Sequence, residues 1–241
     1  YGVRFFVDKN ATGANDGTSW ADAYTSLQSA LAASKPCAAV CEIWVATGVY
    51  TPGIVTTDAF TMAAGVSLYG GFAATETLRT QRNPVINLTI LSGDIDNNDI
   101  KDATGTVTST DNIRGTNSQH VLWLDGTTGG ITTASVIDGF TVTAGNATMG
   151  KTNGGGLYCN ADGSGYVCSP TISNMVFSGN RAGFYGGAIY NRAWNGTSSP
   201  IITNVTFSGN TAAGGGALCN DGSHSGASHP ALTNVVFDGN R

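Results

Sequence analysis

The segment SPTISNMVFSGN (residues 169–180) returns thirty residues later as SPIITNVTFSGN (199–210), and again as HPALTNVVFDGN (229–240). A second phrase, GGAIYN at residues 186–191, lies between the first two copies and is repeated as GGALCN at residues 215–220. A fixed repeat length in this range is typical of a solenoid, in which each repeat forms one layer and packs against its neighbours. The sequence therefore predicts a stack of similar coils.

Each copy has the pattern of β-strands. Apolar residues alternate with Ser and Thr, which is the period of a strand with one buried face. Ile172, Met175 and Phe177 are predicted to face inward, and the alternation skips one position at Asn174. Such a skip indicates a bend, and Asn tolerates the left-handed backbone that a bend requires. Two short strands around the bend and a third at the Gly-Gly-Ala-Ile phrase describe one coil of a parallel β-helix.

Equivalent residues of successive coils are expected to stack in ladders, roughly 4.8 Å apart. Stacked Phe side chains bury apolar area continuously, and stacked Asn side chains pass hydrogen bonds along the axis. We interpret these ladders as structural rather than ligand-binding. Their members are Phe177, Phe207 and Phe237; Asn174, Asn204 and Asn234; and Asn180, Asn210 and Asn240.

The rest of the chain is less regular. VIDGFTVTAGN at residues 136–146 and GGGLYCN at 154–160 repeat the order of the two phrases and indicate a fourth, diverged coil. We expect one all-β domain over residues 1–241, with an N-terminal strand and helix at 1–36, irregular coils at 42–130 and regular coils of about 30 residues at 135–241. Further strands are predicted at 42–46, 60–62, 66–69, 89–91 and 120–124, and a polar excursion at 97–117.

The two ends of the stack differ. Between Thr18 and Ser34, apolar residues recur at helical spacing, and Thr18 or Ser19 is the candidate N-cap. We interpret this segment as a helix that caps the N-terminal end of the solenoid. The last repeat stops at Asn240 and Arg241 without its second phrase. The expectation is either a fragment of a longer repeat protein or an uncapped end that associates with another edge. The helical positions are Trp20, Tyr24, Leu27 and Leu31.

Composition is that of an exported protein with a weakly charged surface. The 241 residues include 34 glycines and only 11 Lys plus Arg against 16 Asp plus Glu, so nucleic acid is not an expected partner. No apolar run is long enough to span a membrane. The chain begins at Tyr1, as a mature secreted product or a cut chain would.

Five cysteines are present. Cys37 and Cys41 lie four positions apart, and Cys159 and Cys168 enclose a short Gly-rich loop, so two local disulfides are reasonable and would leave Cys219. Sequence alone does not fix the connectivity. A zinc site is the alternative, although these spacings fit no common ligand pattern.

One acidic cluster lies at the start of the excursion. Asp94, Asp96, Asn98 and Asp99 supply oxygen atoms in a spacing that resembles the beginning of a calcium loop, but the Gly and the distal Glu of an EF-hand are absent. A structural Ca²⁺ that holds the excursion is one interpretation, and a solvated acidic loop is the other. No other cofactor is indicated.

The repeats resemble those of a known family. FSGN at 177–180 and 207–210 and FDGN at 237–240 match the FxxN motif of the polymorphic outer membrane protein repeats of bacteria, and GGAI at 186–189 matches their GGAI motif. Residues 6–24, VSLYGGF at 66–72 and ILSGDID at 90–96 are similar to bacterial surface proteins with a right-handed parallel β-helix. The resemblance covers nearly the whole chain. It implies a right-handed solenoid, exported to the bacterial surface or secreted, and adhesin function; no catalytic residues carry over from that family.

An enzyme is the main alternative, because polysaccharide lyases and hydrolases use the same solenoid. Hydrolases need two close carboxylates, and lyases need calcium-bound carboxylates with an Arg or Lys base. The acids between Asp138 and Asp238 are isolated in sequence, so the regular coils favour a non-catalytic surface module. We expect an adhesin or rigid stalk whose loops, including those near Trp194 and His224, bind glycans or cell-surface proteins. A subunit that stacks end to end into a fibre is the second alternative.

Overall fold

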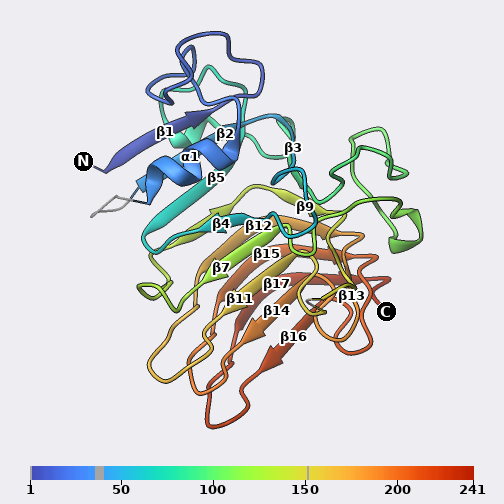
Figure 1. Ribbon diagram of the computed structural model, residues 1–241. Coiled ribbons are helices and arrows are strands. Elements are labelled where there is room, and N and C mark those ends of the chain that lie inside the picture. The colour runs from blue at the N-terminus through green and yellow to red at the C-terminus, as the bar shows by residue number, and fades with distance from the viewer. Residues whose placement is uncertain (1, 36–40, 151) are drawn as a thin grey trace.

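The computed structural model describes residues 2–35, 41–150 and 152–241. Its two large sheets are built from strands that pair in parallel, and its helices are few and short. In Figure 1 the strands lie in successive layers from the N-terminal end (blue) to the C-terminal end (red). This curled parallel arrangement is that of a parallel β-solenoid.

Within the described residues, the larger sheet, sheet A, has ten strands. Its main order is β1-β2-β5-β8-β12-β9-β6-β3, and β15 and then β17 continue it from β12. The strands are β1 (Val3–Val7), β2 (Cys41–Ala46), β3 (Gly48–Tyr50), β5 (Val66–Phe72), β6 (Thr89–Ser92), β8 (Val136–Asp138), β9 (Thr141–Thr143), β12 (Thr171–Ser178), β15 (Ile201–Ser208) and β17 (Ala231–Asp238).

The smaller sheet, sheet B, has five strands in the part of the chain that the structure describes, in the order β16-β14-β11-β7-β4. These are β4 (Phe60–Met62), β7 (Leu122–Asp125), β11 (Leu157–Asn160), β14 (Ile189–Arg192) and β16 (Leu218–Asp221). The Gly-Gly-Ala-Ile phrases supply β14 and β16, as the sequence predicts. A further pair of short strands joins β10 (Asn146–Ala147) to β13 (Arg181–Ala182).

The thirty-residue repeat sets the register of the last three coils. β12, β15 and β17 pair at an offset of thirty, and the pairing skips only Asn174, Asn204 and Asn234, whose φ angles of 53°, 56° and 52° are left-handed. The two short strands predicted in each phrase therefore merge into one eight-residue strand with a bend. In the preceding coil they stay separate as β8 and β9, with Gly139 (φ 85°) at the bend.

The main apolar cluster of the interior extends along the stack from Val7 to Ala217, and a smaller cluster contains Trp44, Tyr69 and Phe72. The Phe177 and Phe207 rings are fully buried and stack with centroids 5.4 Å apart, and the Phe207 and Phe237 rings stack at 5.1 Å. Burying each such side chain stabilises the fold by roughly 1.5–3 kcal/mol. Phe237, in the last described coil, is 51% exposed because no further layer covers it.

The N-terminal helix is shorter than predicted. α1 spans Leu27–Ser34, and the preceding Ser26 makes no side-chain cap, so neither Thr18 nor Ser19 is the N-cap. The Asp22 carboxylate instead accepts hydrogen bonds from the Ala14 N–H and the Ser19 hydroxyl. Short polar side chains of this kind compete with helical hydrogen bonds, and they fold the preceding residues into turns. The helix packs beside β1, β2 and β4.

The aromatic residues before the helix have other partners. Trp20 packs with Phe6 and Phe72, and its indole N–H donates to the Glu76 carbonyl at 2.9 Å. Tyr24 forms a parallel bridge with Val7. Their helical spacing therefore reflects two separate packing sites rather than one helix face.

The irregular coils contain the predicted strands, with small shifts at their ends: β2, β4, β5, β6 and β7 correspond to them, and β7 begins at Leu122 instead of His120. The 97–117 excursion projects to the side of the stack (green, Figure 1) and carries one short 3₁₀ helix, η2 (Thr110–Asn112). It returns over the edge of sheet A, where the Val107 carbonyl accepts from the Thr143 and Ser178 hydroxyls at 3.0 and 3.1 Å.

The Cys159–Cys168 disulfide is confirmed, with Cα atoms 5.7 Å apart, and Cys219 is a free thiol. Cys41 is disulfide-bonded, and its predicted partner Cys37 lies outside the described residues. Over the described part of the chain, no helix has the length and apolar character needed to cross a bilayer.

Candidate functional site

An inner Asn ladder lies within the coils. The Asn210 side chain donates to the Asn240 Oδ1 at 2.8 Å and to the Phe177 carbonyl at 2.9 Å. Its Oδ1 accepts from the Asn180 backbone N–H at 3.0 Å and from the Asn180 Nδ2 at 2.9 Å. These four bonds use the full capacity of a primary amide. The Asn210 side chain of the inner ladder therefore has a structural role and joins neighbouring coils.

An outer Asn ladder runs along the exposed face of sheet A. The Asn234 Nδ2 donates to the Asn204 Oδ1 at 2.7 Å, and the Asn204 Nδ2 donates to the Asn174 Oδ1 at 3.2 Å. The Asn174 Nδ2 donates in turn to the Asp138 Oδ2 at 2.9 Å. Within this chain of bonds Asn174 and Asn204 each use one N–H and one acceptor position. Each amide therefore keeps one donor and one acceptor position for another partner.

Asp138 ends the outer ladder and is itself fully engaged. Its carboxylate accepts the Ser173 hydroxyl at 2.5 Å and forms an ion pair with the Arg82 guanidinium, which also donates to the Gly70 carbonyl at 2.9 Å. The Asp138 and Arg82 side chains are only 10% and 14% exposed. This pair ties the segment after β5 to the outer face of sheet A.

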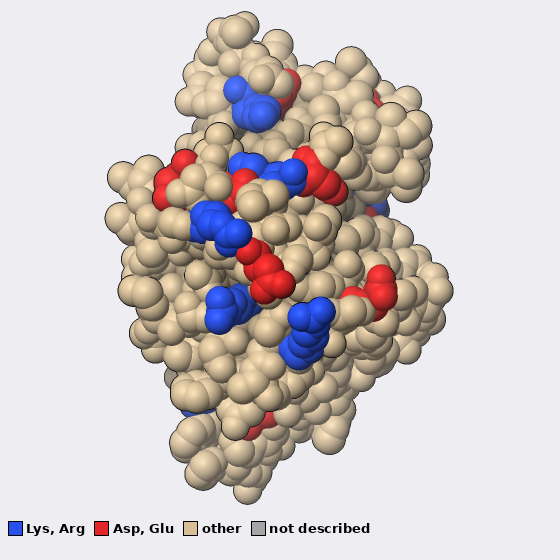
Figure 2. All heavy atoms as spheres, turned by 90° about the vertical axis from the view of Figure 1, so that its right-hand side faces the viewer, with Lys and Arg blue, Asp and Glu red and all other residues tan. Residues whose placement is uncertain are grey.

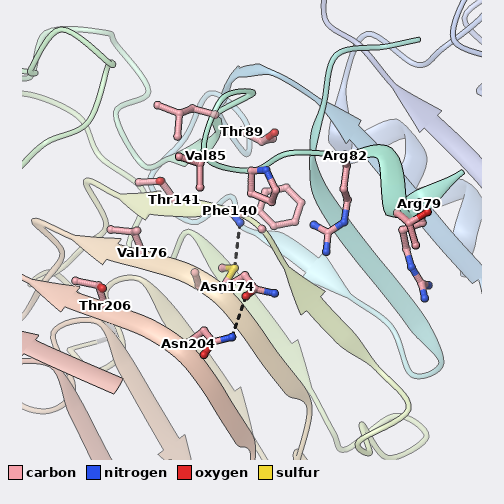
Figure 3. Close-up of a pocket in the computed structure, with 15 residues that line it drawn as sticks. Arg79, Arg82, Val85, Thr89, Phe140, Thr141, Asn174, Val176, Asn204 and Thr206 are labelled. Carbon is pink, nitrogen blue, oxygen red and sulfur yellow. Dashed lines mark hydrogen bonds between the residues drawn. The ribbon is translucent and has the colours of Figure 1, made fainter. Parts of the chain in front are cut away.

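That segment forms one wall of a groove of about 750 Å³, which we call the outer groove. Its floor includes Thr141, Val176 and Thr206, which lie side by side on β9, β12 and β15. Figure 3 shows the segment that carries Arg82 and Val85 above this floor. Asn174 and Asn204 of the outer ladder lie beside the floor. The lining residues are Arg79, Thr80, Arg82, Pro84, Val85, Leu88, Thr89, Gly139, Phe140, Thr141, Asn174, Met175, Val176, Asn204 and Thr206.

Both guanidinium groups that line the outer groove have a carboxylate partner. Arg79, in the short 3₁₀ helix η1 (Arg79–Gln81), pairs with Glu42 at 2.6 Å and lies over the Tyr69 ring at 4.4 Å. Arg82 is paired with Asp138. The lining set contains no other ionisable side chain. Figure 2 shows a sparsely charged face on which basic and acidic side chains lie next to one another. The groove therefore combines amides, hydroxyls and apolar side chains with two guanidinium groups that each have a carboxylate partner. Glu42, the partner of Arg79, also lies 3.7 Å from Arg4.

A second depression of about 440 Å³, the aromatic cleft, lies over sheet B. The register of β7, β11 and β14 places Trp123, Tyr158 and Tyr190 in one outward row, and the Trp123 and Tyr158 rings stack at 4.6 Å. At its rim Arg192 forms an ion pair with Asp162 at 3.0 Å. Burial raises the pKa of Tyr158 to about 12, so this phenol stays protonated at neutral pH.

The Asp221 carboxylate, which lies beside Arg192, is poorly suited to acid catalysis. Asp221 accepts the Tyr190 hydroxyl at 2.6 Å and lies 3.9 Å from the Arg192 guanidinium. Burial alone would raise the pKa of Asp221, but hydrogen bonds from Ser223 and Tyr190 and the Arg192 charge outweigh it and lower that pKa below its ordinary value. A glycosidase general acid needs a raised pKa so that it holds a proton to donate.

The predicted calcium ligands are bonded to other groups of the same chain. The Asp94 carboxylate accepts from the Lys101 ammonium at 2.7 Å and from the Asn98 backbone N–H at 3.0 Å. The Asp96 carboxylate accepts from the Asn98 side chain at 2.9 Å. Burial raises the pKa of Asp99, which accepts the Asn117 side chain at 2.8 Å.

Among the described residues, no three Asp, Glu, His or Cys side chains converge in an arrangement that could hold a metal ion. Lys101 also brings its own positive charge to the Asp94 carboxylate, where a cation would otherwise bind. Calcium binding at this loop therefore stays a prediction, and the bonds of the loop favour a closed acidic turn.

Trp194 is used in loop packing. Its ring stacks on His224 with centroids 4.0 Å apart and planes 8° apart, and the Arg192 guanidinium lies 4.8 Å from its centroid. These two contacts cover ring surface that a ligand would otherwise use. The loops near Trp194 and His224 are therefore weaker candidates for binding than the outer groove.

The sequence did not single out the wall of the outer groove. Arg82, Pro84 and Val85 lie outside the repeats, and the contact between Arg82 and Asp138 joins residues 56 positions apart. The available signal was Asp138 itself, which sits in register with Ser173 and Thr203 of the next coils. An acid at a position that is otherwise Ser or Thr indicates a basic partner nearby.

Two regular coils match a known repeat. The family model of the Chlamydia polymorphic membrane protein repeat matches residues 174–192 and 204–221. Each matched segment begins at an Asn of the outer ladder and ends with the last residue of a sheet B strand, at Arg192 or Asp221. The chain is thus similar to that repeat over two coils. No curated protein and no solved structure matches the chain.

Proposed function

We propose that this chain is a non-catalytic, adhesin-like module of a bacterial cell surface. The observation that carries the proposal is the match of two coils to the Chlamydia polymorphic membrane protein repeat. The outer groove supports it, because its floor is formed partly by the same coils and opens to solvent beside the outer Asn ladder. We further propose that the coils close as a right-handed helix in one domain and that α1 covers its N-terminal end.

Binding without catalysis is the better account of the ionisable groups. Asp138 and Arg82 in the outer groove are paired with each other, and Asp162 and Asp221 at the aromatic cleft both lie beside Arg192. The pKa of Asp221 is lowered by its hydrogen bonds and by the Arg192 charge, so this carboxylate does not hold a proton for a leaving group. The lysine of the acidic loop, Lys101, is likewise paired with Asp94 rather than available as a base.

The test is an adhesion assay with microspheres coated with the purified chain. We expect saturable attachment to epithelial monolayers or to bacterial cell surfaces, with competition by the soluble chain and no competition by albumin. Albumin-coated microspheres are the control. Parallel runs with EDTA report on calcium at the Asp94 loop. Polysaccharides incubated with the chain are analysed for released oligosaccharides. Release of products, or attachment no greater than that of albumin, would overturn the proposal.

A further inference from the structure

We propose that the outer groove binds a neutral oligosaccharide that lies along the solenoid axis, across the strands of sheet A. The inference rests on the adhesin-like function proposed above and names the class of its ligand. It comes from three properties of the groove: a repeated pair of hydrogen-bonding positions, apolar surface beside them, and the absence of unpaired charge.

The hydrogen-bonding positions repeat from coil to coil. Asn174 and Asn204 lie on neighbouring parallel strands, which places their amides roughly 4.8 Å apart. Each has one N–H and one acceptor position left after the ladder bonds. A sugar hydroxyl is both a donor and an acceptor, so a chain of sugar rings can satisfy both positions at each coil.

Apolar surface lies next to these amides. Val176, which is 37% exposed, forms the floor between Thr141 and Thr206. Val85 is 84% exposed and lies on the wall formed by the segment after β5. Sugar rings combine hydroxyl edges with faces of C–H groups, and a site with a few polar groups on a mainly apolar lining suits such a ligand.

The paired charges of the groove argue against an acidic ligand, and the spacing between coils argues against an extended peptide. An acidic ligand would need a cation without a carboxylate partner. Arg79 pairs with Glu42, which also lies 3.7 Å from Arg4, and Arg82 pairs with Asp138. An extended peptide repeats its hydrogen-bonding pattern every two residues, roughly 6.6–6.8 Å, which does not match the spacing between coils. The paired guanidinium groups thus disfavour an acidic ligand and the spacing disfavours an extended peptide, whereas the amides and the apolar floor favour a neutral oligosaccharide.

The experiment screens the intact chain against an array of neutral oligosaccharides, including cellohexaose, mannohexaose and chitohexaose, with hexagalacturonate as the acidic counterpart. Affinities for the hits are measured by isothermal titration calorimetry. We expect a neutral oligosaccharide to bind and hexagalacturonate to bind more weakly. Preference for hexagalacturonate, or no binding to any neutral oligosaccharide, would overturn the proposal.

Two matched pairs of variants locate the site. Asn204→Gly removes a groove amide and keeps the left-handed backbone, which Gly adopts freely, whereas Asn234→Gly removes the next amide of the same ladder outside the groove. Loss of two neutral hydrogen bonds should weaken binding about tenfold in Asn204→Gly and leave Asn234→Gly unchanged. Equal affinities in this pair would count against the assignment.

The second pair tests the groove by blocking it. Thr206→Arg places a long side chain on the groove floor, and Val236→Arg places it at the equivalent exposed position of the next coil. Binding should be lost in the first variant and retained in the second, and thermal melts confirm that both fold. If the microspheres adhere but Thr206→Arg binds oligosaccharides normally, the groove assignment fails while the adhesin-like function stands. Release of products would instead refute the function itself.

Discussion

The inner Asn ladder should contribute several kcal/mol to stability, and Asn210→Ala tests this directly. The substitution removes four hydrogen bonds from a side chain that is fully buried. It leaves the Asn180 backbone N–H and the Phe177 carbonyl without the amide that served both. Each lost bond costs about 1 kcal/mol net, and more where a buried group stays unsatisfied, so the expected loss is about 4 kcal/mol.

Urea denaturation followed by far-ultraviolet circular dichroism measures the free energy of unfolding. Asn240→Ala is the matched control, because Asn240 holds the same ladder position in the last described coil and is only partly buried. Water can replace its hydrogen bonds, so we expect a loss of roughly 1 kcal/mol. If Asn210→Ala costs no more than Asn240→Ala, the inner ladder does not stabilise the stack as argued.

Asn210→Asp tests whether the free energy of unfolding changes with pH in the direction that a buried carboxylate requires. A carboxylate cannot donate to the Phe177 carbonyl or to the Asn240 Oδ1, and burial raises its pKa above the unfolded value. The folded state then binds more protons than the unfolded state between these two pKa values. Relative to wild type, the variant should therefore gain stability as the pH falls from 7 toward 4 and lose it as the pH rises. A difference from wild type that does not change with pH would contradict a buried carboxylate.

Three further outcomes are expected. Replacing Cys159 and Cys168 together by Ser should cost about 3 kcal/mol in urea denaturation, because the disulfide joins residues nine positions apart and restricts the unfolded chain. The wild type in reductant should lose at least as much, because reduction also opens the disulfide of Cys41. Phe207→Ala should cost about 3–5 kcal/mol and Phe237→Ala well under half of that, since the first ring is fully buried and the second is half exposed. The Asp221 pKa is lowered in the folded state, so the stability that Asp221 contributes is present above the unfolded pKa and is lost as the pH falls through the folded pKa. In acid-denaturation curves, Asp221→Asn should therefore lose less stability than the wild type between pH 5 and pH 2. Identical curves for the two proteins would refute that assignment.

The regular coils could be predicted because contacts in a solenoid occur at a fixed sequence offset. Phe177 and Phe207 meet because they are thirty residues apart, and the Asn residues at the bends follow from the break in alternation. The same reasoning found the strands of sheet B. Neither conclusion required knowledge of distant parts of the chain, since each coil packs on its neighbours.

The helix boundary and the outer groove could not be predicted, because both depend on contacts with no fixed offset. Trp20 leaves the helical pattern to pack with Phe6 and Phe72, and the turn at Asp22 is stabilised by polar bonds that periodicity does not report. The groove exists because residues 79–88 fold back onto β9 and β12. The sequence pattern of an insertion between strands gives its length but not the face on which it lies.

The ion pair between Arg82 and Asp138 connects the regular coils to the irregular segment that forms the groove wall. Asp138 accepts the first N–H of the outer ladder, so a negative charge at this end favours one orientation of every amide that follows, with its N–H toward Asp138 and its oxygen toward the next coil. Arg82 compensates the charge and at the same time holds the wall of the groove above the ladder. The ion pair between Arg82 and Asp138 thus sets the orientation of the amides in the outer Asn ladder. As a result, the donors and acceptors of the groove follow one another in a fixed order along the axis. A ligand that binds there would accordingly meet a surface with a direction, and its two ends would not be equivalent.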